Sequence, residues 1–145
     1  MTNLKEGDTA PDFSATNAQG NEVNLSQFQG KNVVLYFYPK DDTPGCTIEA
    51  KEFTQTAAQF ANMNTVVIGV SYDDATCHQA FIDKFGLKVE LLADTSRKIA
   101  EAYGTKGEKY PSRDTFLIGK DGKIAKIWRG VKPEGHAQEV LKLVA

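Results

Sequence analysis

The sequence predicts an α/β protein with a mixed central β-sheet flanked by helices and a small N-terminal hairpin. Two apolar runs, at 32–38 and 65–70, are rich in β-branched and aromatic residues, which is typical of strands buried on both faces. A helical pattern of apolar residues follows each run, which indicates parallel strands joined by crossover helices. An Asp-Gly turn at 121–122 separates two further strand patterns, so the sheet should also hold antiparallel strands.

Local signals set the expected boundaries of the elements. Thr43 is a good N-cap and Pro44 a good first helical residue, while Gly86 and Gly104 are expected to end helices. The predicted order is a hairpin turned at 19–21, a strand at 32–38, a helical stripe from Thr43 or Pro44 to Ala61, a strand at 65–70, a helix at 75–85 capped by Asp73 or Asp74, a strand at 90–92, a helix from Thr95 or Ser96 to Tyr103, paired strands at 114–118 and 123–128, and a helix at 136–144. With no repeat or linker, we expect one domain over residues 1–145.

Composition excludes several classes of protein. A net charge of -2 with scattered basic residues gives no reason to expect a nucleic-acid or membrane partner. No stretch approaches the roughly 18 apolar residues of a membrane span. The first residues, Met1 to Gly7, lack the apolar segment of a signal peptide, so we expect a cytoplasmic protein.

The cysteines and histidines do not form a zinc pattern. The chain has two of each, Cys46, Cys77, His78 and His136, and only the adjacent Cys77 and His78 are close in sequence. Adjacent residues chelate a tetrahedral ion poorly, so we expect no metal site. Because neighbours on a helix do not face each other, we interpret His78 as a solvated polar residue. His136 carries no signal beyond its place near a helix start.

Two pairs of acidic residues also have a simple structural interpretation. Asp41-Asp42 and Asp73-Asp74 each follow a predicted strand and precede a predicted helix. Turn and cap chemistry explains them more simply than acid-base catalysis does.

Cys46 is the strongest candidate for a reactive residue. It is predicted in the first turn of a helix, where the helix dipole and free backbone N–H groups favour a thiolate. Gly45 would let another molecule approach the backbone closely. The alternative is a small buried hydrophobe, the commoner fate of a free cysteine. Thr43 occupies the place of the first cysteine in a Cys-x-x-Cys pair, and its hydroxyl could donate to and accept from a bound hydroperoxide.

These residues carry a family resemblance. Pro39-x-x-x-Thr43-x-x-Cys46 resembles the peroxiredoxin active-site motif, and residues 36–50 closely resemble the peroxiredoxin Q branch, also called bacterioferritin comigratory protein. The similarity extends over nearly the whole chain, at 7–13, 69–71 with Asp73, 113–118, 121–124 and 132–137.

The resemblance implies a thioredoxin-like fold and a peroxidase that needs no metal or organic cofactor. It implies that the Cys46 thiolate attacks hydrogen peroxide or an organic hydroperoxide, and that thioredoxin or a similar thiol reductant recycles the enzyme in antioxidant defence. Thr43 and Arg113 would hold the peroxide, and Pro39 would shield the site from water. Taken alone, Arg113 would be interpreted as a solvated charge. Glu49 would support the site from behind or be a simple helix-face carboxylate. Relatives are often monomers, which we expect here.

The sequence departs from the family pattern at the second, resolving cysteine. One common position, five residues after Cys46, holds Lys51, and the other aligns with Ile82. Cys77 is about five residues before Ile82, which is more than one helical turn. Three alternatives remain: Cys77 resolves the oxidised Cys46 after local unfolding, an outside thiol does so, or Cys77 pairs with another chain.

Two other functions compete with a peroxidase that turns over. A non-enzymatic redox sensor or holdase would react once with peroxide and then stall, so peroxide consumption coupled to a thioredoxin system separates the two. A glutathione-dependent peroxidase is disfavoured because its active-site sequence differs from Pro39-x-x-x-Thr43-x-x-Cys46.

Overall fold

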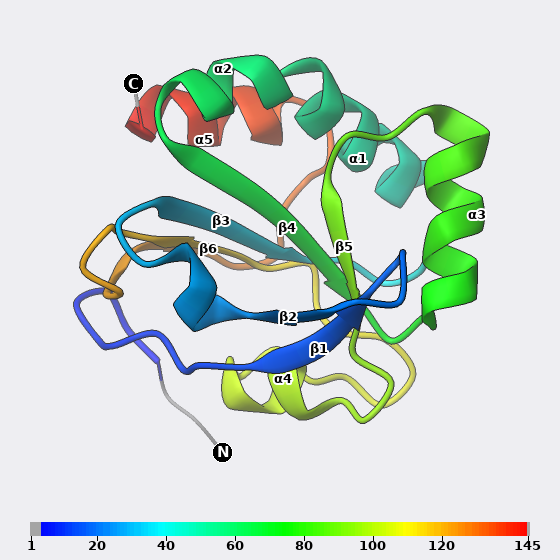
Figure 1. Ribbon diagram of the computed structural model, residues 1–145, viewed down its shortest axis with the longest axis horizontal. Helices are drawn as coiled ribbons and strands as arrows, with labels where there is room; N and C mark the ends of the chain where they lie inside the picture. The colour runs from blue at the N-terminus through cyan, green and yellow to red at the C-terminus, as the bar shows by residue number, and fades with distance from the viewer. Residues whose placement is uncertain (1–3, 145) are drawn as a thin grey trace.

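A seven-stranded mixed sheet forms the centre of the protein, and the computed structural model describes residues 4–144. The strand order is β2-β1-β5-β4-β3-β6-β7. The elements are β1 (Ser14–Asn17), β2 (Glu22–Asn24), the 3-10 helix η1 (Leu25–Phe28), β3 (Asn32–Phe37), α1 (Pro44–Gln55), α2 (Ala57–Asn62), β4 (Thr65–Ser71), α3 (Ala75–Phe85), β5 (Glu90–Ala93), α4 (Lys98–Ala102), β6 (Thr115–Ile118), β7 (Ile124–Trp128) and α5 (His136–Val144). Figure 1 shows α1, α2, α3 and α5 on one side of the sheet and α4 on the other.

The central strand β3 explains why the core has two halves. It pairs in parallel with β4 and antiparallel with β6. Because successive side chains point to opposite faces, Val34 and Tyr36 join the cluster under α1, α2, α3 and α5, whereas Leu35 and Phe37 join the cluster on the α4 side. The continuous apolar run at 32–38 therefore reflects burial on both faces, and the predicted mixed sheet flanked by helices is confirmed.

The first long helical pattern is divided into two helices. The apolar stripe predicts continuity to Ala61, but α1 ends at Gln55 and α2 begins at Ala57. Between them, the Thr56 hydroxyl donates to the carbonyl oxygens of Glu52 and Phe53, at 2.9 and 3.2 Å. A threonine hydroxyl that bonds to the preceding turn competes with the backbone pattern and bends helices. The apolar pattern predicted the buried face of this segment but not the break between α1 and α2.

The start of α4 differs from the prediction. Thr95 or Ser96 was expected to begin it, but the helix starts at Lys98 after Arg97, which has a φ of 65°. The buried carboxylate of Asp94 accepts from the N–H groups of Ile99 and Ala100, at 3.1 and 2.9 Å. Asp94 therefore satisfies N–H groups in the first turn that a cap residue would otherwise serve.

The helix α3 begins and ends as the sequence predicts. Asp74 is its N-cap and accepts from the N–H of Cys77 at 2.8 Å. Gly86 closes it with a left-handed φ of 62°. Within residues 4–144, none of the helices is both long and apolar enough to cross a membrane.

Candidate active site

Cys46 lies beyond the carboxyl end of β3, in the first turn of α1. Its N-cap, Thr43, has the extended φ and ψ of −96° and 155°, and its carbonyl oxygen accepts from the N–H of Thr47 at 2.8 Å. The first-turn N–H groups have no intrahelical partners, so the positive end of the helix dipole lies at the sulfur. Cys46 is only 1% exposed. The sulfur is therefore largely shielded from water and lies at the positive end of the helix dipole.

Arg113 contacts the sulfur from another part of the chain. Its Nη2 lies 3.3 Å from Cys46 Sγ. The antiparallel register that pairs Tyr36 with Thr115 brings the start of β6 beside the end of β3, which explains the meeting of residues so distant in sequence. Burial lowers the pKa of Arg113, but Cys46 and Glu49 raise it and outweigh burial. The guanidinium therefore remains a fixed cation beside the sulfur.

Glu49 lies behind the sulfur, one helical turn after Cys46. It is 1% exposed, and its Oε1 accepts from Arg113 Nη1 at 2.7 Å. Burial raises its pKa to about 7, against the lowering effect of Arg113. Within residues 4–144, its Oε2 has no hydrogen-bond partner. Glu49 is thus a buried carboxyl group that is hydrogen-bonded to Arg113, and not a solvated residue on the helix surface.

Thr43 presents its hydroxyl in the loop between β3 and α1. The hydroxyl donates to the carbonyl of Lys40 at 2.7 Å and makes no side-chain cap bond to the helix. Its oxygen therefore keeps lone pairs that can accept from an incoming O–H group. Pro39, one residue after Tyr38, is half-buried at the start of this loop.

Gly45 is packed against the arginine and against the loop that joins β7 to α5. A Cβ atom on Gly45 would lie 3.1 Å from Arg113 Nη2 and 3.3 Å from Pro133 Cγ. The N–H of Val131 in the same loop donates to the Arg113 carbonyl at 2.8 Å. A side chain at position 45 would therefore press directly on the guanidinium.

Comparisons with known sequences and structures identify the family of this chain. The AhpC/TSA family profile matches residues 6–127, which is most of the chain. The chain belongs to the AhpC/TSA family. A protein named putative peroxiredoxin bcp from Helicobacter pylori is 44% identical over 150 residues, covering 98% of this chain and 99% of the relative. The chain is therefore a peroxiredoxin, a thiol-dependent peroxidase, and the resemblance seen in the sequence is confirmed.

Two solved structures extend the comparison to the fold. A mutant of PrxQ from Xylella fastidiosa superposes with a TM-score of 0.94 at 34% identity, covering 99% of this chain and 97% of the other. A bacterioferritin comigratory protein from Xanthomonas campestris, described with its alkyl peroxide reduction activity, gives 0.88 at 31% identity and covers 91% and 89%. The peroxiredoxin fold, which is thioredoxin-like, is thereby shown for this chain.

The second cysteine of this peroxiredoxin lies in a different environment. Cys77 is exposed in the first turn of α3, and both cysteines are free thiols. A hydrogen bond to Asp74, burial and the nearby Asp73 raise the pKa of Cys77. Near neutral pH it is therefore a weaker nucleophile than an unperturbed cysteine.

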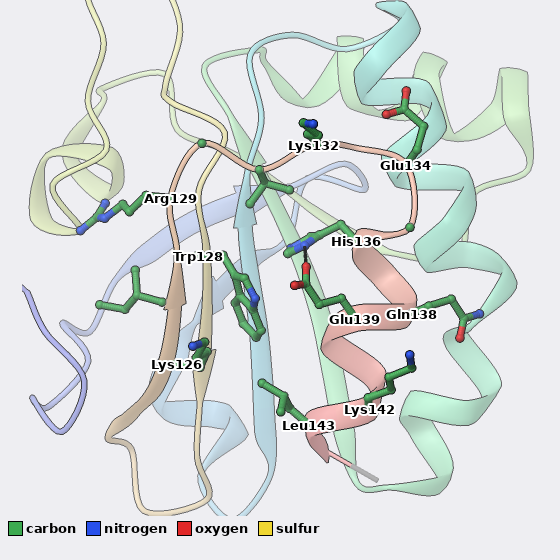
Figure 2. Close-up of a pocket in the computed structure, with 14 residues that line it drawn as sticks. Lys126, Trp128, Arg129, Lys132, Glu134, His136, Gln138, Glu139, Lys142 and Leu143 are labelled. Atoms are coloured by element: carbon green, nitrogen blue, oxygen red, sulfur yellow. Dashed lines mark hydrogen bonds and ion pairs between the residues drawn. The ribbon is translucent and has the colours of Figure 1, made fainter.

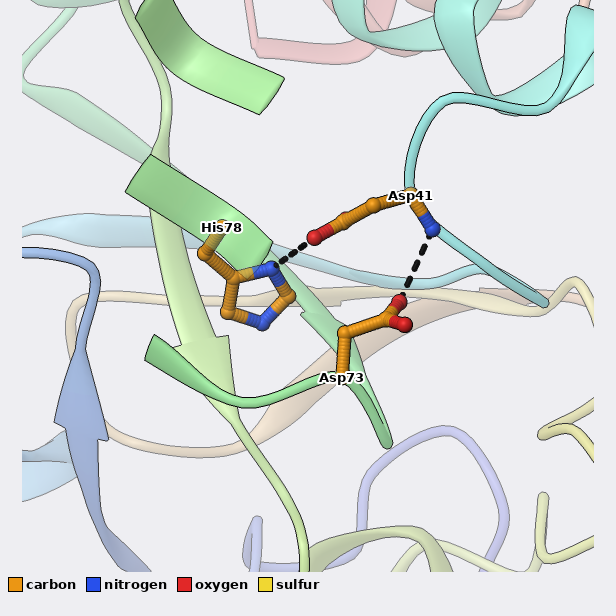
Figure 3. Close-up of side chains that lie close together, drawn as sticks. All are labelled: Asp41, Asp73 and His78. Atoms are coloured by element: carbon orange, nitrogen blue, oxygen red, sulfur yellow. Dashed lines mark hydrogen bonds and ion pairs between the residues drawn. The ribbon is translucent and has the colours of Figure 1, made fainter. Parts of the chain in front are cut away.

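The interpretation of His78 as solvated is wrong. The side chain is 0% exposed, and its Nδ1 lies 2.6 Å from Asp41 Oδ2 (Figure 3). Its Nε2 lies 2.9 Å from the carbonyl of Leu92. Asp41 is likewise a buried carboxylate and not simply a turn residue. The sequence gives no sign of this pair, because His78 faces a loop residue 37 positions earlier.

Asp41, Asp73 and His78 also bring their ligand atoms within 4.8 Å of one another, which is the spacing of a potential cation site. Asp41 and His78 bond to each other, and Asp73 Oδ2 accepts from the Ser71 hydroxyl at 2.7 Å and from the Asp41 N–H at 2.8 Å. Hydrogen bonds therefore account for the cluster.

His136, which the sequence places near a helix start with no further signal, is the first residue of α5 and is buried. Its Nε2 lies 2.9 Å from the Thr115 hydroxyl and its Nδ1 3.2 Å from Glu139, and burial lowers its pKa. Next to it, a groove of about 900 Å³ runs between β7 and α5, with Trp128 on its wall (Figure 2). His136 thus connects α5 to the sheet beneath this groove.

Proposed function

We propose that Cys46 is the residue of this peroxiredoxin that attacks the peroxide. The observation that carries the proposal is the 3.3 Å contact between Arg113 Nη2 and the sulfur, at the start of a helix. The Cys46 thiolate attacks the terminal oxygen of R–O–O–H, so that the O–O bond breaks and an S–O bond forms. Cys46 becomes a sulfenic acid, and the departing alkoxide or hydroxide takes a proton to give an alcohol or water.

The roles of the neighbouring residues follow from their chemistry. Arg113 stabilises the thiolate and then the negative charge on the departing oxygen. Thr43 accepts from the peroxide O–H, and Pro39 keeps water from the loop. Glu49 fixes the guanidinium from its other side, because its carboxyl accepts from Nη1 while Nη2 faces the sulfur.

The proposed substrates are hydrogen peroxide and alkyl hydroperoxides. The alkyl peroxide reduction described for the Xanthomonas campestris relative supports the second class. The proposed physiological reductant is thioredoxin or a similar protein dithiol, since the sulfenic acid must be returned to a thiol at each turnover.

We assign the resolving step to the outside thiol and not to Cys77. Cys46 is buried whereas Cys77 is exposed, and the Asp74 hydrogen bond raises the pKa of Cys77. The reductant thiol condenses with the sulfenic acid, which releases water and forms a mixed disulfide. The second thiol of the reductant then breaks that disulfide and restores Cys46.

A monomeric, cytoplasmic, single-domain enzyme is part of the same proposal. The edge strand β7 is covered by the chain's own N-terminal segment. The N–H of Gly7 donates to the Ile124 carbonyl, the N–H of Ile124 to the Asp8 carbonyl, and the N–H of Ile127 to Glu6 Oε2. A covered edge disfavours strand pairing between copies. Free thiols recycled by a thiol reductant fit a reducing compartment.

Mass mapping of the cysteines after one equivalent of peroxide tests the assignment. We expect sulfenic acid on Cys46, no peroxide consumption by Cys46→Ser, and continued thioredoxin-coupled turnover by Cys77→Ser. Loss of turnover in Cys77→Ser would instead make Cys77 the resolving thiol. A single turnover followed by a stall in the wild type would support a redox sensor.

A further inference from the structure

The loop that joins β3 to α1, residues 38–43, is held by one buried carboxylate. Asp41 is 9% exposed, and its Oδ2 lies 2.6 Å from His78 Nδ1. The Tyr38 hydroxyl donates to its Oδ1 at 2.5 Å, and the Asp41 N–H donates to Asp73 Oδ2 at 2.8 Å. Figure 3 shows the Asp41 side chain pointing at the imidazole while its N–H points at Asp73. Both carboxylate oxygens and the backbone N–H of Asp41 are therefore engaged.

The positions of the hydrogen atoms on His78 and Asp41 make the contact between them a strong one. His78 Nε2 lies 2.9 Å from the Leu92 carbonyl, which can only accept, so Nε2 carries a hydrogen. A proton must also lie between Nδ1 and Asp41 Oδ2, whichever atom holds it, because two lone pairs would otherwise face each other. The pair is neutral as a whole and shielded from water, and separating it would leave a buried polar group unpaired.

Within residues 4–144, two ion pairs join this loop to α3, and the Asp41–His78 pair is the buried one. The other joins Asp42 Oδ2 to Lys84 Nζ at 2.8 Å, with side chains that are 46% and 58% exposed. Exposed ion pairs contribute little to stability. The polar connection between the loop and α3 therefore depends chiefly on Asp41 and His78, and the Tyr38 ring adds a contact with Phe81, with centroids 6.5 Å apart.

A protein reductant cannot reach Cys46 while the loop stays in place. The cysteine is 1% exposed, whereas a disulfide requires the two sulfurs to come to about 2 Å. We propose that the Asp41–His78 pair is a latch that positions the loop for the attack on peroxide and opens to admit the reductant thiol. This inference rests on the proposed function. In it, Asp41 and His78 are positioning residues and do not touch the substrate.

A latch has a consequence that a purely structural role lacks. Weakening it should slow the reaction of Cys46 with peroxide, because the loop no longer holds Thr43 and the start of α1 in place against Arg113. The same change should speed the reaction of oxidised Cys46 with an outside reagent, because the site opens more often. A substitution that only destabilises the fold, by the same amount, should not change these two rates in opposite directions.

The test compares three variants in the full-length chain with Cys77→Ser, so that Cys46 is the single thiol. His78→Asn removes the latch, and Tyr38→Phe removes one bond to Asp41 while leaving the imidazole. Ile82→Ala lies on the same helix, α3, where Ile82 packs against the core, and is the control for a loss of packing. Three quantities are measured: hydrogen exchange of residues 41–47, the rate of peroxide reduction, and trapping of the Cys46 sulfenic acid by dimedone.

We expect His78→Asn to speed exchange of residues 41–47 and dimedone trapping by about 10-fold or more, and to slow peroxide reduction. Tyr38→Phe should fall between wild type and His78→Asn, and Ile82→Ala should change the local exchange by less than about 2-fold after correction for global stability. Equal effects in His78→Asn and Ile82→Ala, or none in His78→Asn, would overturn the latch.

Hydrogen exchange needs no chemistry at Cys46. It therefore shows whether the Asp41–His78 pair holds residues 41–47 in place even if the proposed function is wrong. Absence of a Cys46 sulfenic acid in the wild-type protein would overturn the function alone.

Discussion

Arg113 Nη2 lies 3.3 Å from the sulfur of Cys46, although 67 positions separate the two residues in sequence. The other terminal nitrogen of the guanidinium donates to Glu49 at 2.7 Å. A planar group with two donors spans the sulfur and the carboxyl at once, and a lysine ammonium cannot reproduce that arrangement. The orientation of the cation should therefore matter as much as its charge.

Arg113→Lys tests this directly. We expect its second-order rate with hydrogen peroxide to fall by about 100-fold, the order seen when one positioned donor to a developing oxyanion is lost. Arg129→Lys is the matched control, since Arg129 pairs with Asp114 at 2.9 Å outside the sulfur's contacts. Stopped-flow fluorescence of the single tryptophan, Trp128, follows the reaction. An Arg113→Lys rate close to wild type would show that charge alone suffices.

The Thr43 hydroxyl should act in catalysis and not as a helix cap. Its side chain makes no cap bond to α1 and donates instead to the Lys40 carbonyl. Thr43→Val keeps the shape and removes the oxygen, so we expect a loss of about 100-fold in the peroxide rate with only a small change in stability. Thr43→Ser retains the hydroxyl and should keep most of the activity. If Ser and Val lose activity equally, the methyl group and not the hydroxyl is what matters.

Much of this site could be predicted from sequence because its signals are local. The strand run, Pro44 at a helix start and the placement of Cys46 all lie within a few residues of one another, where backbone preferences act. Arg113 was assigned a role only through resemblance, since the antiparallel pairing of β3 with β6 that brings it to the sulfur has no local sign.

The predictions that the structure corrects share a physical cause. Thr56, Asp94 and His78 each use a side chain to bond with groups that composition or periodicity cannot identify. A histidine next to a cysteine on a helix looks solvated until the tertiary structure buries it against Asp41. Buried polar contacts between distant segments are therefore the part of this protein that sequence patterns do not reach.

Glu49 should make stability depend on pH in an unusual direction. Its pKa is about 7 in the folded protein against 4.5 for an ordinary glutamate, so the folded state binds the proton more tightly between these values. The stabilisation is fully present below pH 4.5 and is lost as the pH rises through 7. Between pH 5 and 7.5 this group alone should lower the free energy of unfolding by about 2 kcal/mol.

Urea unfolding of wild type and Glu49→Gln at both pH values isolates this effect, because other carboxylates contribute equally to both proteins. The free energy of unfolding of wild type minus that of Glu49→Gln should fall by about 2 kcal/mol from pH 5 to 7.5. Glu101→Gln, at a side chain that is 69% exposed, should show no comparable change. A difference that stays constant or grows with pH would mean that Glu49 is ionised throughout.

Gly69 is the position where the core tolerates no side chain. It lies directly opposite Tyr36 in the parallel pairing of β3 and β4. A Cβ atom there would come within 2.7 Å of Tyr36 Cζ and 2.8 Å of Leu91 Cδ2. The Tyr36 ring cannot easily retreat, because it stacks on Phe53 with centroids 4.7 Å apart.

Gly69→Ala should therefore lower the free energy of unfolding by about 1–3 kcal/mol, the usual effect of overpacking a core. Gly119→Ala is the matched control, since its Cβ would lie 3.1 Å from the carboxylate of the exposed Asp121 side chain and at an ordinary 3.6 Å from the Lys123 carbonyl oxygen. Urea unfolding at pH 7 measures both variants. Because the Tyr36 ring also lies in the cluster that contains Cys46, we expect Gly69→Ala to slow peroxide reduction as well. Equal stabilities of the two variants would show that Tyr36 and Phe53 can shift together without cost.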